Sequence, residues 1–215
     1  MADDKITFSF GKNWESFLSH ADASALNKAI SDIEEWLGVG YVEGKTVLDI
    51  GSGSGLHSMA YFRLGAKSIV SFDYDLHSVE ATKRCWQSCG NPDNWKVLHG
   101  SVLERSFIQR LGQFDIVYSW GVLHHTGSLW NAIENAAIPT GPEGLFWISI
   151  YNKTPNFPKE LSLKQRYNRS NNIGKRWLEI IEIIKVMHYR IKNRRNPFAW
   201  NERRMRGMDV YHDIV

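Results

Sequence analysis

The fold class follows from one stretch, Val47-Leu48-Asp49-Ile50-Gly51-Ser52-Gly53-Ser54-Gly55-Leu56-His57, which passes from an apolar run through three glycines into a helical pattern. Glycine permits tight turns and lets a ligand approach the backbone closely. The helix that follows begins with amide groups that have no partner within the helix, and these donors favour a polar ligand. The stretch therefore predicts a strand, a ligand-binding loop and a helix in direct succession.

The rest of the first 150 residues repeats this alternation. Short apolar runs rich in β-branched residues predict strands at 46–50, 68–73, 96–99, 114–119 and 145–150. Helical spacing of apolar residues predicts helices at 25–37, 57–64, 78–89, about 104–111, and 128–137. Such alternation is typical of a parallel sheet covered on both faces. The predicted fold class is α/β, with a Rossmann-like, doubly wound and mainly parallel sheet.

The glycine spacing discriminates between ligands. A dinucleotide fingerprint needs Gly-x-Gly-x-x-Gly, but the third position is Leu56 when counted from Gly51 and Ser58 when counted from Gly53. No Gly-Lys-Ser/Thr follows, which excludes a P-loop. The carboxylate of Asp49 suits a ligand with an ammonium or sulfonium charge better than a pyrophosphate. A nicotinamide-dependent oxidoreductase therefore remains only as a weaker alternative.

A second carboxylate, Asp73, ends the next predicted strand about 20 residues after the loop. An acidic residue at that place binds ribose hydroxyls in related nucleotide-binding folds. An ordinary surface turn is the alternative for Asp73. The acidic strand end, the glycine turn and this second carboxylate together predict a cationic nucleoside ligand.

These motifs resemble the class I S-adenosylmethionine-dependent methyltransferases, and within them the small-molecule group related to the ubiquinone-biosynthesis enzymes. The matching segments are 47–55, 72–73, 99–102 and 114–125, with the strand 144–150 after a Pro/Gly turn. The resemblance covers about residues 40–152. It implies the strand order 3-2-1-4-5, S-adenosylmethionine as cofactor and S-adenosylhomocysteine as product.

The resemblance also implies a cofactor site. Asp49 and the glycine loop would hold the methionine part, Asp73 the ribose, and Tyr74 would pack on the adenine. The family often has an Asp after the third strand, where this chain has Ser101. The predicted cofactor-binding residues are Asp49, Gly51, Ser52, Gly53, Gly55, Asp73, Tyr74, Ser101, Val102 and Ser119.

Methyl transfer mainly requires alignment of the reacting atoms and exclusion of water, and needs a general base only for a protonated acceptor. His125, after the fourth strand, is the candidate base because its ordinary pKa is near neutral. A histidine bonded to nearby backbone is the equal alternative. The Asn/Asp-Pro-Pro-aromatic signature of base-amine methylation is absent after that strand. The only two cysteines, Cys85 and Cys89, fall short of a zinc set, so no metal site is predicted.

Three regions are predicted: an N-terminal helical lid (1–40), a cofactor-binding domain (41–152) and a basic helical insert or cap (153–215). The lid hypothesis rests on the aromatic run at 8–17, in which Trp14 would shield the cofactor. Packing against the sheet is its alternative. No stretch of about 18 apolar residues and no signal peptide occurs, so we expect a cytoplasmic enzyme without a transmembrane segment.

Charge separates the last region from the rest. Residues 1–150 hold 11 Lys and Arg against 17 Asp and Glu, whereas residues 151–215 hold 15 against 6. Helices are predicted near 175–192 and 202–208, with aromatic residues among the basic ones of 185–206. This segment suits an anionic surface, a nucleic acid or an acidic small substrate, and a solvated helix face is its alternative.

The predicted function is methyl transfer to a small-molecule or lipid-like acceptor. The alternative is a nucleic-acid methyltransferase or a binding module that uses the basic segment. The family usually closes its sheet with a two-stranded hairpin, which the sequence after residue 150 does not show. We therefore hypothesise a truncated chain whose fifth strand has an open edge, unless a homodimer covers that edge.

Overall fold

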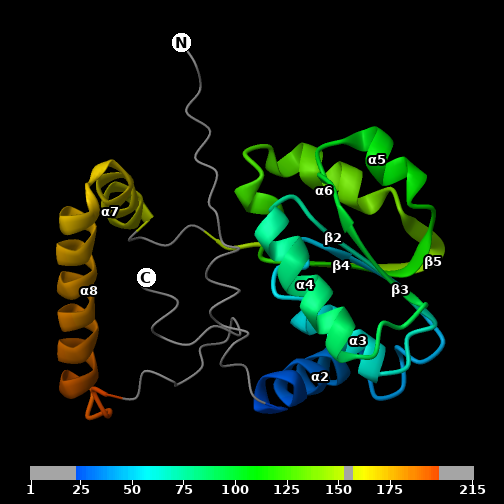
Figure 1. The fold of residues 1–215 in the computed structure, drawn as a ribbon, viewed down its shortest axis with the longest axis horizontal. Helices are drawn as coiled ribbons and strands as arrows, with labels where there is room; N and C mark the ends of the chain where they lie inside the picture. The colour runs from blue at the N-terminus through cyan, green and yellow to red at the C-terminus, as the bar shows by residue number, and fades with distance from the viewer. Residues whose placement is uncertain (1–22, 153–156, 199–215) are drawn as a thin grey trace. The chain divides into compact units, whose positions relative to one another are not determined.

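The computed structural model describes residues 23–152 and 157–198 (Figure 1). The aromatic run at 8–17 with Trp14, and the helix predicted at 202–208, lie outside these residues. The chain divides into two compact units, Met1–Tyr151 and Asn152–Val215. Each unit is described by itself.

The first unit is built on a five-stranded parallel sheet in the order β3-β2-β1-β4-β5. Its strands are β1 (Thr46–Ile50), β2 (Ser68–Asp73), β3 (Trp95–His99), β4 (Phe114–Trp120) and β5 (Thr140–Ser149). The predicted fold class and strand order are confirmed. Because all strands run the same way, their carboxyl ends meet at one edge, where ligands bind in open sheets of this kind.

Helices cover both faces of this sheet (Figure 1). They are α2 (Ala23–Leu37), α3 (Leu56–Arg63), α4 (Leu76–Ser88), α5 (Arg105–Arg110) and α6 (Leu129–Ala137). One apolar core joins the sheet to α2, α3 and α4, and the other joins it to α5 and α6. Both faces are therefore buried, which explains why the strands read as nearly continuous apolar runs.

The fifth strand begins at Thr140, five residues before the predicted start at Leu145. The pairing with β4 shifts between Phe114, which lies opposite Thr140, and Ile116, which lies opposite Leu145. A Cβ added to Gly144 would lie 2.7 Å from the Phe114 carbonyl oxygen. The Gly- and Pro-containing segment was assigned to a turn, but it forms an irregular start of the strand where only glycine fits.

The second unit contains a helix that the sequence did not predict. Its described part consists of α7 (Phe157–Arg169) and α8 (Asn172–Lys192). Pro158 does not prevent this helix, because proline is tolerated in the first turn of a helix, where its missing N–H is not needed. Tyr167 Oη donates to Glu179 Oε1 at 2.7 Å and so joins the two helices.

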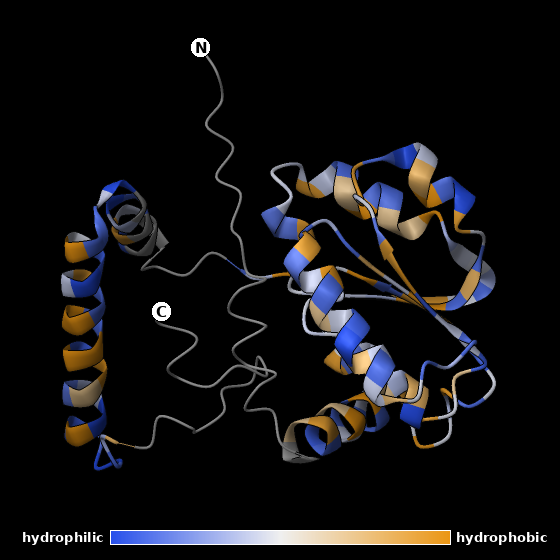
Figure 2. Cartoon of the chain, viewed as in Figure 1, coloured by the Kyte–Doolittle hydropathy of each residue, from blue (hydrophilic) through white to orange (hydrophobic). Residues whose placement is uncertain are grey.

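The predicted helix near 175–192 is confirmed as α8. Figure 2 shows apolar bands on its successive turns, and its sequence has Trp177, Ile180 and Ile184 at helical spacing. Within 150–152 and 157–198 no strand follows β5. For the residues after 198, the absence of the closing hairpin stays a prediction. None of the described helices is long and apolar enough to cross a membrane.

Candidate cofactor site

The glycine loop joins β1 to α3 with a backbone that other residues rarely adopt. Gly51 and Gly55 have φ of 74° and 79°. A Cβ on Gly51 would lie 2.4 Å from Val122 Cγ1, and one on Gly55 would lie 2.7 Å from Thr82 Cα. Glycine is therefore required at both positions by conformation and by space.

Hydrogen bonds fix this loop to its neighbours. The amides of Gly51 and Ser52 both donate to the Phe72 carbonyl, at 2.9 and 3.1 Å. The hydroxyls of Ser52 and Thr82 are 2.9 Å apart, which links the loop to α4. The loop is thus held in one shape before any ligand arrives, which lowers the entropic cost of binding.

The second predicted carboxylate lies against the loop. Asp73 Oδ2 accepts from the Gly53 amide at 3.0 Å, and Asp73 Oδ1 accepts from the Asp75 amide at 2.9 Å. Burial raises the pKa of Asp73, and these backbone donors oppose the rise. The structure therefore brings Asp73 and the glycine loop together, as the sequence predicted.

Asp49 lies beneath the loop with 2% of its surface exposed. Burial raises the pKa of Asp49 to about 7, the hydrogen bond from Ser58 Oγ lowers it, and the nearby Asp73 raises it. A buried carboxylate that titrates near neutrality is stabilised as the anion by an adjacent cation. The arrangement therefore suits a positively charged ligand group.

The predicted adenine side of the site follows β2 and β3. Tyr74 is 68% exposed, and its carbonyl lies 3.0 Å from His99 Nε2. Ser101 Oγ accepts from the Leu103 amide at 3.2 Å, while the Val102 carbonyl accepts from Asn135 Nδ2 at 3.0 Å. These contacts shape the turn after β3, and the roles of the three residues toward a ligand stay predictions.

Ser119 is fully buried in β4, and its hydroxyl donates to the Ile50 carbonyl at 3.0 Å. This bond fastens β4 to the end of β1, just before the loop. The contact supports the loop from below, and a direct role of Ser119 toward a cofactor stays a prediction.

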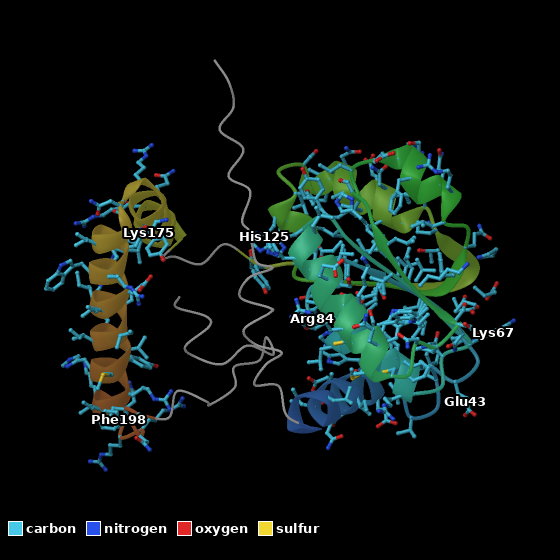
Figure 3. The ribbon with its side chains drawn as sticks, viewed as in Figure 1. Glu43, Lys67, Arg84, His125, Lys175 and Phe198 are labelled. Atoms are coloured by element: carbon cyan, nitrogen blue, oxygen red, sulfur yellow. The ribbon has the colours of Figure 1, made fainter. Side chains whose placement is uncertain are left out.

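The candidate base, His125, lies in the 3-10 turn Leu123–His125 after β4. Its ring centroid is 4.0 Å from that of His124 and 5.9 Å from that of Tyr151, which follows β5. Figure 3 shows His125 where the chain leaves β5. Imidazole and phenol groups thus gather at the carboxyl ends of β4 and β5, and Val122, just before this turn, lies against Gly51 of the glycine loop.

The sequence did not predict the polar side chains that surround Asp49. Ser58 on α3, Ser71 on β2 and Trp95 on β3 are buried and hydrogen-bonded in series. One signal was present: Ser71 interrupts an apolar strand at the position that pairs with Asp49 in β1. No cluster of metal-ligating side chains occurs within the described ranges.

This fold and this loop define a cofactor-binding domain of the class I S-adenosylmethionine-dependent methyltransferase type. A family model described as ribosomal protein L11 methyltransferase (PrmA) matches residues 31–149. The chain belongs to this family.

Curated relatives match shorter parts of the chain. A ribosomal protein L11 methyltransferase of Prochlorococcus marinus (strain AS9601) is 43% identical over 74 residues, which are 34% of this chain and 24% of that protein. A tRNA U34 carboxymethyltransferase of Shewanella halifaxensis is 36% identical over 90 residues, 40% of this chain and 26% of that protein. The chain thus covers about a quarter of the length of the curated relatives it matches.

Solved structures share the fold. A putative S-adenosylmethionine-dependent methyltransferase of Methanococcus maripaludis superposes with a TM-score of 0.55 at 18% identity, covering 90% of this chain and 85% of that one. The YcgJ protein of Bacillus subtilis superposes with a TM-score of 0.51 at 19% identity, covering 66% and 58%. The predicted likeness to the ubiquinone-biosynthesis group is not confirmed by these relatives.

Proposed function

We propose that this chain binds S-adenosylmethionine on the β1 loop and transfers its methyl group to a macromolecular acceptor, in the first place a protein. The observation that carries the cofactor assignment is the pair of carboxylates, Asp49 and Asp73, brought to one rigid glycine loop. The family membership supports the same assignment.

The residues present fit this cofactor. Its amino acid end carries an ammonium group, its sulfur a positive charge, and its ribose two hydroxyls. Asp49 supplies a buried negative charge below the loop, and Asp73 supplies carboxylate oxygens beside it. Opposite charges in a partly desolvated site attract far more strongly than in water.

When bound, the cofactor supplies an electrophilic methyl on a sulfonium, with S-adenosylhomocysteine as the product. The chain's residues then need to hold the acceptor atom in line and keep water out. His125 and His124 lie at the carboxyl edge of the sheet, where an acceptor would enter. His125 accepts the proton of a protonated acceptor nitrogen in this proposal, which requires the neutral imidazole.

The acceptor class is inferred from the relatives. Their names specify a ribosomal protein or a tRNA as the molecule modified, which argues for a macromolecule rather than for the small or lipid-like acceptor expected from the sequence. RNA is the second candidate, because residues 151–215 carry a net charge of +9 that suits a phosphate backbone.

Cofactor binding is tested first by calorimetry with S-adenosylhomocysteine and with NAD. We expect S-adenosylhomocysteine to bind and NAD not to bind. The dissociation constant of S-adenosylhomocysteine should increase at least tenfold in both Asp49→Asn and Asp73→Asn, because each substitution removes one charge from the site. Lys28→Gln, a surface change on α2, is the matched control and should bind normally. Binding of NAD alone would exclude the proposal.

The acceptor is then tested with methyl-labelled cofactor and three separate pools: RNA-free ribosomal protein, protein-free RNA, and a small-molecule and lipid extract. Label in the protein pool is the expected result. Label in RNA alone would favour the second candidate, and label only in the extract would return the acceptor to the small-molecule class.

A further inference from the structure

A line of buried polar side chains crosses the core beneath the cofactor loop. Trp95 Nε1 donates to Ser71 Oγ at 2.8 Å, Ser71 Oγ lies 2.7 Å from Ser58 Oγ, and Ser58 Oγ donates to Asp49 Oδ2. Asp49 and Trp95 are 2% exposed, and both serines are fully buried. The surrounding side chains on this face of the sheet form an apolar core, so the line is isolated from water.

The sheet register places these groups in a row. Asp49 in β1 pairs with Ser71 in β2, and Ser71 pairs with Val97 in β3, two residues after Trp95. Residues two apart in a strand point to the same face. Ser58, on the first turns of α3, completes the row from above the sheet.

Chemistry fixes the direction of every proton in this line. An indole N–H only donates, so Ser71 accepts from Trp95. The Asp49 carboxylate only accepts, so Ser58 gives it its single proton and must itself accept from Ser71. All three donors therefore point toward the carboxylate.

A protonated Asp49 does not fit this line equally well. Its O–H would donate to Ser58 Oγ, and the Ser58 proton would lose its acceptor. If Ser58 turned its proton to Ser71 instead, the Ser71 proton would be left without an acceptor, because the indole beyond it has no lone pair. A buried hydroxyl proton without an acceptor costs about 1–3 kcal/mol.

We propose that Ser58, Ser71 and Trp95 are positioning residues that keep Asp49 ionised and oriented through this one-directional line of hydrogen bonds. The inference rests on the proposed function, in which the Asp49 carboxylate attracts the positive charge of the cofactor. It adds that the charge of the site depends on donors below the loop, which Asp49 separates from the ligand.

The other titratable groups around Asp49 are one carboxyl group, which disfavours its charge, and three side chains that are neutral over the pH range of the test. Asp73 faces it from the end of β2 and disfavours its charge. Burial holds the pKa values of Tyr61 on α3 and Tyr118 on β4 well above their usual range, so both phenols are neutral. Burial lowers the pKa of His57, also on α3, to about 4, so its imidazole is neutral above pH 6.

The direct test is titration of the Asp49 carboxyl carbon by NMR in the full chain without ligand. Ser58→Ala removes the last donor and should move the midpoint upward by about 1 pH unit. Trp95→Phe keeps an aromatic ring beside Phe62 but removes the first donor of the line, and should move the midpoint upward by less. Ser88→Ala, which removes a serine bond to the Cys85 carbonyl in α4, is the control and should not move it.

Cofactor affinity provides the second readout. With a midpoint near 8 in place of 7, Ser58→Ala should bind S-adenosylhomocysteine about fivefold more weakly at pH 7 and less than twofold more weakly at pH 9. A loss of affinity that is equal at both values would indicate a merely structural role and overturn the inference. So would unchanged NMR midpoints in both variants.

The two proposals fail separately. Absence of S-adenosylhomocysteine binding to the unaltered chain overturns the proposed function, whereas the NMR midpoints still decide whether the line controls Asp49. If Ser58→Ala does not fold, the midpoint of Trp95→Phe decides the inference alone.

Discussion

At the scale of single residues, two aspartates of the same sheet have pKa values displaced in opposite directions. Burial raises the pKa of Asp49 at the carboxyl edge to about 7. At the other edge, hydrogen bonds from the Thr46 amide and hydroxyl, each 2.8 Å long, lower the pKa of Asp115. Asp115 contributes to stability as an anion, whereas the charge of Asp49 costs stability and, in the proposed function, attracts the cofactor.

Replacing Asp49 with Asn should stabilise the protein at alkaline pH while it weakens cofactor binding at least tenfold. The folded-state pKa of Asp49 lies above its unfolded value, so the folded chain binds more protons between about pH 4 and 7 and its stability falls as pH rises through that window. Asn carries no charge and avoids this loss. We expect the free energy of unfolding at pH 8 to increase by about 2 kcal/mol, with a smaller gain at pH 5. Denaturant unfolding at both pH values measures the difference.

Asp115→Asn is the matched comparison for this prediction. A lowered folded-state pKa means stability that is present above the ordinary pKa of aspartate and is lost as pH falls through the folded value. Its replacement should therefore cost about 1 kcal/mol at pH 5 and at pH 8 alike. A stabilisation by Asp49→Asn that did not depend on pH would contradict the assignment of a buried charge.

At the scale of elements, two different neighbours leave no space for a side chain at Gly51 and Gly55 in the loop between β1 and α3. Gly51→Ala should clash with the side chain of Val122, and Gly55→Ala with the backbone of Thr82 in α4. We expect each to cost about 2 kcal/mol or more and to weaken S-adenosylhomocysteine binding at least tenfold, because the loop must shift. Adding Val122→Ala should restore part of the stability and affinity lost in Gly51→Ala, because it removes the clashing side-chain atoms. It should not rescue Gly55→Ala, which clashes with backbone that no substitution removes.

Gly90→Ala is the control that separates the strain of a positive φ from a clash with neighbouring atoms. Gly90 also has a positive φ, of 87°, but no atom lies within 4 Å of an added Cβ. Its replacement should cost only about 1 kcal/mol, the strain of the left-handed backbone. Thermal unfolding of these three single variants and of the two double variants with Val122→Ala, with calorimetry of the ligand, tests the set. Equal losses at Gly51, Gly55 and Gly90 would show that the neighbours are not limiting.

The sequence predicted the elements that carry strong local signals. The apolar runs gave all five strands, and the strand order came from the resemblance. The start of β5 at Thr140 and the helix α7 were not predicted, because glycine and proline at their beginnings also fit turns. Of the site, the glycine loop and both carboxylates were found from spacing. The line from Trp95 through Ser71 and Ser58 was not, because it joins three strands and a helix that only the fold brings together.

At the scale of the whole molecule, charge divides the chain as its domains do. Residues 1–150 carry a net charge of −6, and residues 151–215 a net charge of +9. The boundary between the compact units falls at residue 151, almost at the change of sign. In the proposed function the acidic part binds the cationic cofactor, and an acceptor that contains RNA would bind to the basic part.

This division predicts that salt affects the two ligands differently. Exposed charges are screened at about 8 Å in physiological salt, whereas buried pairs are screened much less. Raising salt from 50 to 300 mM should increase the KM for an RNA-containing acceptor such as ribosomal subunits at least tenfold, and change the dissociation constant of S-adenosylhomocysteine less than twofold. Steady-state methyl transfer and calorimetry at both salt concentrations measure these values.

Lys185→Gln with Lys192→Gln on α8 should raise the KM for the RNA-containing acceptor at low salt, whereas Lys28→Gln on α2 should not. If the acceptor KM changed neither with salt nor with the α8 substitutions, the basic segment would not bind the acceptor. Recognition of the acceptor would then depend on the carboxyl edge of the sheet around His125.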